Sequence, residues 1–194
     1  MIKIGIVKES RSDDKRTPLT PNNVKDLLTS FSNINLIVEP STNRCFTDQE
    51  YKNNGAIISK NLDVCDLILG VKEIDPKNLI PNKKYMFFSH TSKIQSDNSA
   101  AAQGTPGMDK KLLLKEIQNK KITLIDYENI REVSGEGYRY LGFGRFAGII
   151  GAYNSLNLYL KLFNKKPLSR VFEINNYKKI KELISKQNFN KIKI

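Results

Sequence analysis

The sequence predicts an α/β protein, Rossmann-like or flavodoxin-like, with a mostly parallel sheet and helices on both faces. Short aliphatic runs recur along the 194 residues, segments with helical spacing separate them, and the first run, Lys3–Val7, alternates apolar and polar side chains. Alternating strands and helices favour parallel pairing with right-handed crossovers. Ligands of such sheets bind outside the carboxyl ends of the strands, so a site is expected there.

Six apolar runs have the length and composition of strands. Ile4 and Ile6 of the first run share one face with the preceding Ile2, and the later runs are rich in Ile, Leu, Val or aromatic residues. Tyr138–Leu141 is a further plausible strand, and the last four residues begin another. The six expected strands are residues 3–7, 34–38, 56–58, 66–71, 85–89 and 122–126.

Capping residues mark two helix starts. Thr20 is followed by Pro21 at the first helical position, and Val24, Leu27, Leu28 and Phe31 then recur at helical spacing. Residues 47–50, Thr-Asp-Gln-Glu, open a second, short helix that ends near residue 55. The expected helices are residues 21–31, 47–55, 111–119, 146–163 and 177–186.

The long helix expected over 146–163 carries small residues, including Gly148 and Gly151, on part of its surface. Because small residues let another backbone approach closely, this face is expected to be packed through these glycines and Gly144. Residues 142–147 also fit the G-x-G-x-x-A spacing of a dinucleotide-binding turn. The acidic residue that should follow about 20 positions later is missing, however, so helix packing is the favoured interpretation.

Composition excludes several classes of protein. No apolar run approaches the roughly 18–20 residues of a membrane span, and the first residues lack the features of a signal peptide. Two cysteines, Cys45 and Cys65, and one histidine are too few for a disulfide framework or a structural zinc site, so no metal is expected. A reducing cytoplasm is the default compartment.

The formal charge of +12 raises the question of nucleic-acid binding. The excess comes from 25 Lys against 7 Arg, whereas bidentate phosphate and base recognition favours Arg. Residues 165–194 hold nine Lys or Arg and two acids, which accounts for +7 of the +12. The charge is concentrated at the end of the chain, and neither nucleic acid nor membrane is expected as a partner.

Residues 99–109, Ser-Ala-Ala-Ala-Gln-Gly-Thr-Pro-Gly-Met-Asp, differ in composition from the rest of the chain. They hold three of its six alanines. We interpret them as a mobile or inserted loop rather than as a functional lid.

Titratable side chains follow the expected strands at the sheet edge where a ligand would bind. A lysine directly after an apolar strand can act as an acid or base near neutrality, and a histidine titrates in that range without help. Arginine can bind a substrate carboxylate through two parallel hydrogen bonds. The candidates are Arg11 and Arg16, Lys72 and Glu73, His90, and Glu128.

Taken together, these residues predict a site for a small zwitterionic molecule with several carboxylates. Glu73 and Glu128 would hold a substrate ammonium or tune Lys72 and His90. Taken singly, each residue has a simpler interpretation, because a lone histidine at a strand end is often structural and a Lys-Glu pair after a strand is usually solvated. Only their convergence on one sheet edge favours a site.

Several motifs resemble those of the alanine dehydrogenase and transhydrogenase superfamily, in order from residue 2 to about residue 155. The opening Gly-Ile-Val-Lys-Glu, the Arg-x-x-Leu-Thr-Pro motif and the later Gly-Val-Lys-Glu are similar to those of the superfamily as a whole. Three further segments resemble its branch of lysine-forming saccharopine dehydrogenases and lysine–ketoglutarate reductases. The motifs are residues 4–9, 14–21, 70–73, 87–95, 124–128 and 143–152.

The resemblance implies roles for these residues. Lys72 and His90 match an acid–base pair that handles protons while a secondary amine is oxidised to an imine and hydrolysed. Arg16, and less closely Arg11, match a ligand of the substrate carboxylate. Glu73 and Glu128 match acids that tune the pair and receive the lysine moiety.

The resemblance also implies a domain organisation. Residues 1–143 would be the N-terminal, substrate-side domain, 144–164 an interdomain helix, and 165–194 a basic connector to a nucleotide-binding domain that the chain lacks. NAD or NADP would then bind the full-length enzyme and not this chain, which we expect to be inactive alone. The alternatives are an alanine dehydrogenase-like domain and a non-catalytic amino-acid-binding domain.

Overall fold

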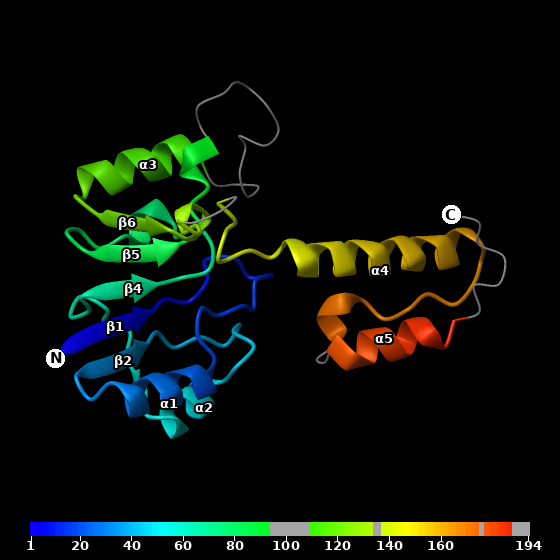
Figure 1. The fold of residues 1–194 in the computed structure, drawn as a ribbon, viewed down its shortest axis with the longest axis horizontal. Helices are drawn as coiled ribbons and strands as arrows, with labels where there is room; N and C mark the ends of the chain where they lie inside the picture. Colours follow the sequence, from blue (N-terminus) through cyan, green and yellow to red (C-terminus); the bar gives the residue numbers. More distant parts are fainter. Residues whose placement is uncertain (94–108, 134–136, 175–176, 188–194) are drawn as a thin grey trace. The chain divides into compact units, whose positions relative to one another are not determined.

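A six-stranded, all-parallel sheet with strand order β3-β2-β1-β4-β5-β6 forms the centre of the fold. The computed structural model describes residues 1–93, 109–133, 137–174 and 177–187. The order is that of a Rossmann sheet, in which the direction of strand addition reverses between β1 and β4. The predicted α/β class is confirmed (Figure 1).

The elements lie close to the expected ranges. The strands are β1 (Ile2–Ile6), β2 (Ile34–Val38), β3 (Ile57–Ile58), β4 (Leu67–Leu69), β5 (Lys84–Phe87) and β6 (Thr123–Asp126). The helices are α1 (Pro21–Ser30), α2 (Asp48–Asn53), α3 (Lys110–Asn119), α4 (Gly144–Leu162) and α5 (Tyr177–Ser185). Short 3-10 turns cover Pro76–Asn78, Thr91–Lys93, Tyr127–Asn129 and Val171–Glu173. None of the described helices is long and apolar enough to cross a membrane.

Both predicted helix caps are present. The Thr20 side chain accepts the backbone N–H of Asn23, whose side chain in turn accepts the Thr20 N–H. Thr47 and Glu50 make the same reciprocal pair at the start of α2. These bonds satisfy N–H groups that have no partner within the helix, so the ends are fixed locally.

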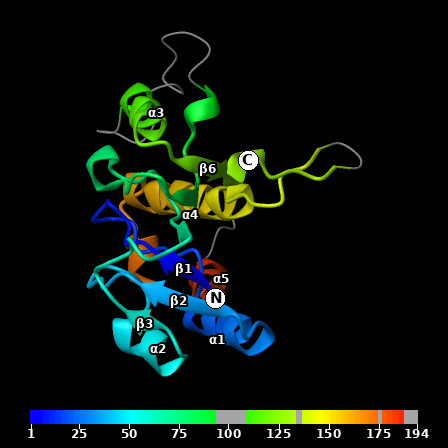
Figure 2. The ribbon, with the colours of Figure 1, turned by 90° about the vertical axis from the view of Figure 1, so that its left-hand side faces the viewer.

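Two apolar clusters cover the two faces of the sheet. Along β2, Leu36 and Val38 belong to the cluster that contains Val24 of α1 and Tyr51 of α2, whereas Ile37 belongs to the other. Because successive strand residues point to opposite faces, the two clusters lie on opposite sides of the sheet. Helices α1 and α2 lie side by side on their face (Figures 1 and 2). The second cluster includes residues of α3 and of the connections before and after β4.

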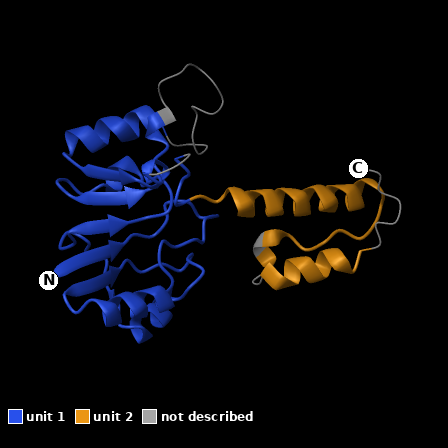
Figure 3. Ribbon diagram, in the orientation of Figure 1, with its two compact units in different colours: residues 1–141 blue, residues 142–194 orange. Residues whose placement is uncertain are grey.

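The chain divides into two compact units, Met1–Leu141 and Gly142–Ile194 (Figure 3). In the second unit, Tyr153 and Leu160 of α4 pack with Leu168 and with Ile180 of α5. The Tyr153 hydroxyl donates to the Ser169 carbonyl at 2.7 Å. The buried side of α4 is therefore made by large residues.

Within the described part of the second unit, the predicted packing through the small residues of α4 is not found. A Cβ added at Gly144, Gly148 or Gly151 would meet nothing within 4 Å. The physical reason is that Tyr153 and Leu160 already bury the opposite side of the helix against its own unit.

The sequence also predicts the structure of three further segments, namely residues 138–141, 99–109 and 191–194. Residues 138–141 do not form a strand of the sheet; the described contact there is a single antiparallel bridge between Arg131 and Arg139. Most of the predicted 99–109 loop lies outside the described residues, and so does the strand expected at 191–194.

Candidate functional site

The carboxyl ends of β4, β5 and β6 bring four of the six predicted site residues together. Lys72 and Glu73 follow β4, His90 follows β5, and Glu128 follows β6. The three strands are neighbours and parallel, so their loops leave the sheet at the same edge. In Figure 1 the arrowheads of these strands point to this edge.

The Lys72 Nζ lies 3.2 Å from the His90 Nε2. An ammonium group has donors only, so this contact is a hydrogen bond when Nε2 is unprotonated or when the amine is neutral. The pair therefore has a proton to donate and a lone pair to accept one. This is the arrangement that acid–base chemistry requires.

Two buried carboxylates flank the pair. Oε1 of Glu73 lies 3.8 Å from Nε2 of His90, and Oε2 of Glu128 lies 3.0 Å from Nδ1. The residues are 4% and 3% exposed. The Nδ1 contact lacks the alignment of a hydrogen bond, so we treat it as an electrostatic contact. Each nitrogen of the imidazole thus has a buried carboxylate near it.

The backbone at His90 is in the left-handed region, with φ of 55°. Residues with a Cβ rarely adopt this conformation, which persists when the surroundings fix it and is frequent at active sites. The Phe88 ring stacks on the imidazole, with centroids 6.3 Å apart and an interplanar angle of 23°. Phe88 also packs against Tyr127, whose pKa burial raises to about 12.

Ser89 and Asp126 tie the ends of β5 and β6 together. The buried Ser89 hydroxyl donates to Oδ2 of Asp126, and the Ser89 and Thr91 hydroxyls are 2.8 Å apart. Oδ1 of Asp126 accepts the Glu128 N–H at 2.9 Å. One carboxylate thus holds the loops that carry His90 and Glu128.

Glu9 joins the loops after β1 and β4. Its two oxygens accept the N–H groups of Val71 and Lys72, at 2.8 and 2.9 Å. Burial raises the pKa of Glu9, although these two bonds and the positive charge of Arg16 act in the opposite direction. Glu9 lies in the segment that carries the family resemblance, but its spacing from Lys72 in the sequence indicates no role for it.

The two predicted arginines lie in the loop after β1 and are paired within it. Nε of Arg11 donates to Asp13 at 2.8 Å, and Nε of Arg16 donates to Asp14 at 2.8 Å. Each guanidinium also contacts its aspartate through Nη2. The hydrogen bond to Asp13 has the largest effect in raising the pKa of Arg11, and the negative charge of Glu73 also helps to raise it. The role of both arginines as carboxylate ligands stays a prediction.

Arg139 is a site residue that sequence reasoning missed. Its Nη1 donates to Oε1 of Glu128 at 3.1 Å, so Glu128 contacts both a guanidinium and the imidazole. The Arg131–Arg139 bridge returns the chain toward Glu128. The Ser-Gly-Glu-Gly run at 134–137 is typical of a turn and was the available signal for this return.

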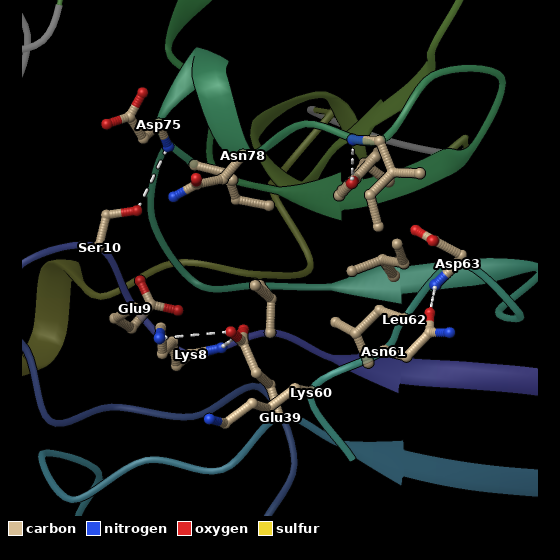
Figure 4. Close-up of a pocket in the computed structure, with 15 residues that line it drawn as sticks. Lys8, Glu9, Ser10, Glu39, Lys60, Asn61, Leu62, Asp63, Asp75 and Asn78 are labelled. Atoms are coloured by element: carbon tan, nitrogen blue, oxygen red, sulfur yellow. Dashed lines mark hydrogen bonds and ion pairs between the residues drawn. The ribbon is translucent and has the colours of Figure 1, made fainter.

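A cavity of about 630 Å³ lies beside this edge without including Lys72 or His90. Figure 4 shows its lining, which includes Glu9, Glu39 and Asp75. It opens between the two connections that flank β4, neither of which contains an α-helix. No group of three His, Cys, Asp or Glu side chains able to hold a metal ion occurs among the described residues.

The glycine-rich segment before α4 does not fit a dinucleotide. A dinucleotide-binding turn follows a strand of the sheet, whereas the residues before Gly142 form only an isolated bridge. The α4 N-terminus also has no side-chain cap.

A family model described as "Alanine dehydrogenase/PNT, N-terminal domain" matches residues 5–149. The chain belongs to this family. The predicted resemblance to the alanine dehydrogenase and transhydrogenase superfamily is therefore confirmed. The match includes all four clustered residues and both arginines.

Curated relatives include two alpha-aminoadipic semialdehyde synthases. The protein of Arabidopsis thaliana is 37% identical over 161 residues, which are 79% of this chain and 14% of the plant protein. The mitochondrial protein of Bos taurus is 34% identical over 169 residues, which are 85% of this chain and 16% of that protein. The chain thus spans less than a fifth of the length of these relatives.

Two solved structures have the same fold. An L-alanine dehydrogenase has a TM-score of 0.60 at 19% identity, and covers 82% of this chain and 41% of its own. A transhydrogenase from Sinorhizobium meliloti has a TM-score of 0.59 at 15% identity, with 81% and 44% covered. At these identities the likeness concerns the fold.

Proposed function

We propose that this chain is the substrate-side domain of an NAD(P)-dependent oxidoreductase that acts on the CH–NH bond of saccharopine, in either direction. The observation that carries the proposal is the 3.2 Å contact between Lys72 Nζ and His90 Nε2, with a buried glutamate near each nitrogen of the ring. Identities of 37% and 34% to aminoadipic semialdehyde synthases favour this branch over the alanine branch.

Lys72 and His90 would share the proton transfers of the reaction. Oxidation removes a proton from the nitrogen of the secondary amine and a hydride from the adjacent carbon, and leaves an imine. Water then adds to the imine carbon, and the C–N bond breaks to give a carbonyl and a primary amine. Each step needs a base or an acid near the nitrogen, and Lys72 and His90 would supply one each.

The charged neighbours would bind the substrate. Glu128 and Glu73 would receive an ammonium group, because both carboxylates are buried beside the pair. Arg16, with Arg11 as a weaker candidate, would bind a carboxylate if substrate displaced its aspartate partner. Arg139 lies on the far side of Glu128 and would limit the negative charge that the site presents.

The nicotinamide group, which would accept or donate the hydride, is proposed to bind outside these 194 residues. The Gly142–Ala147 segment does not fit it. We therefore expect the isolated chain to bind the amino-acid substrate weakly and to show no turnover.

Substrate screening of the intact protein tests the proposal. We expect oxidation of NADH or NADPH with lysine plus 2-oxoglutarate, and not with pyruvate plus ammonia. The reverse preference would support an alanine dehydrogenase-like enzyme. A third outcome is that calorimetry shows binding of lysine or saccharopine while no pair of substrates is turned over. That result would contradict an enzymatic function and support a non-catalytic binding domain.

A further inference from the structure

The Glu9 carboxylate reaches from the loop after β1 to the loop after β4. Oε1 accepts the Val71 N–H at 2.8 Å, and Oε2 accepts the Lys72 N–H at 2.9 Å. Each oxygen thus holds one of two consecutive backbone groups. The second of these groups belongs to Lys72 itself.

This contact begins where the backbone ladder between β1 and β4 ends. The last bond of that ladder runs from the Val7 N–H to the Leu69 carbonyl, at 3.0 Å. On its other side the segment is bound to β5, because the Phe88 N–H donates to the Val71 carbonyl at 3.1 Å. Glu9 therefore supplies the β1 side of a clamp whose β5 side is backbone.

We propose that Glu9 is a positioning residue, which fixes the Lys72 backbone so that Nζ stays within reach of Nε2 of His90. An ionised carboxylate has an acceptor for each N–H group, and such charge-assisted bonds are stronger than bonds between neutral groups. Loss of the clamp lets the Lys72 segment move while β5 still holds His90. Only the effect on turnover rests on the proposed function; the clamp does not.

Glu39 provides a matched control. It follows β2, its Oε2 accepts the Lys8 N–H at 3.0 Å, and its Oε1 lies 3.5 Å from Lys8 Nζ. Figure 4 shows the hydrogen bond between Lys8 and Glu39, with Glu9 beside it. Glu39 thus binds the same loop with the same chemistry but has no bond to the backbone of Val71 or Lys72.

Amide hydrogen exchange in the 194-residue chain, followed by NMR, tests the clamp. We expect Glu9→Ala to speed exchange at both Val71 and Lys72 by about tenfold or more, and Glu39→Ala to leave both unchanged. Glu9→Gln keeps one oxygen acceptor, so exchange should accelerate at one of the two amides. If Glu9→Ala does not fold, Glu9→Gln decides. Wild-type exchange at both amides in the folded Glu9 variants would overturn the proposal.

Turnover of the intact protein tests the consequence for Lys72. We expect Glu9→Ala to lower kcat about tenfold with little change in KM, and Glu9→Gln to restore part of the loss. Unchanged kcat with accelerated exchange would contradict the positioning role. Absence of turnover in the wild-type protein would count against the proposed function alone, because the exchange result does not depend on it.

Discussion

The two units differ in which side chains they bury. The first unit buries Ser89, Asp126 and Glu73 at one edge of its sheet, at 0%, 7% and 4% exposure. In the second unit, α4 exposes large apolar side chains, including Leu158 at 58% and Leu162 at 70%. Burying charge costs free energy unless the charge is paired, and the buried Asp126 carboxylate is bonded to the Ser89 hydroxyl and the Glu128 N–H. Exposed apolar surface is instead typical of contact with another surface.

This difference shows which properties of the sequence indicate chemistry. Most of the positive charge lies near the end of the chain, outside the cluster. The informative charges are few and buried, and they follow adjacent parallel strands. Position in the sheet, rather than charge density, identifies the candidate site.

Core truncation should show the largest difference between the units. Ile68 of β4 is fully buried, so Ile68→Ala should lower the free energy of unfolding by about 2–5 kcal/mol. Leu162→Ala, on the exposed side of α4, should change it by no more than about 0.5 kcal/mol. Urea denaturation measures both. Equal losses would show that the apolar side chains of α4 are as well packed as the sheet core.

Removal of one hydroxyl should have a smaller effect. Ser89→Ala removes the hydroxyl donor to Oδ2 of the buried Asp126, and the expected cost is about 1–3 kcal/mol. Ser155 is the control in the second unit, because its exposed hydroxyl donates to the Gly151 carbonyl within its own helix. Ser155→Ala should change the free energy of unfolding by no more than about 0.5 kcal/mol. Similar costs for both variants would contradict a supporting role for Ser89.

The charged loop of the first unit should give the smallest effect, and one that depends on pH. Burial alone raises the pKa of Asp14, but the hydrogen bonds from Arg16 outweigh it and leave the pKa below its usual value. A lowered folded pKa stabilises the protein above the unfolded value of about 3.9, and this stability is lost as the pH falls through the folded value. Asp14→Asn should therefore destabilise the protein at pH 7 and lose this effect in acid.

Asp13→Asn is the control for this prediction. Its hydrogen bond to Arg11 lowers the pKa of Asp13 in the same direction, but Asp13 is exposed to solvent, which screens the pair. Its effect should be smaller than that of Asp14→Asn in urea denaturation at pH 7 and pH 3. A pH-independent effect of Asp14→Asn would contradict the account.

Elements fixed by local interactions were predictable from the sequence. Thr20 and Thr47 each bond a residue three positions later, so both helix starts could be identified. The expected strand 66–71 was too long because the chain beyond Leu69 bonds to the Glu9 side chain and to β5 instead of continuing its ladder with β1. That contact joins residues 62 positions apart, and no local pattern indicates it.

The candidate site was predictable to a similar extent. The meeting of Lys72, Glu73, His90 and Glu128 follows from the rule that parallel strands present their carboxyl ends at one edge. The supporting bonds of Asp126 and Arg139 depend on how separate loops meet after folding. They could not be deduced from spacing.

The pH dependence of turnover by the intact protein tests the central claim most directly. If Lys72 and His90 are its acid and base, Lys72→Met and His90→Gln should each lower the rate by about 100- to 10,000-fold and flatten its pH profile. Retention of the wild-type pH profile by both variants would contradict an acid–base role for the pair.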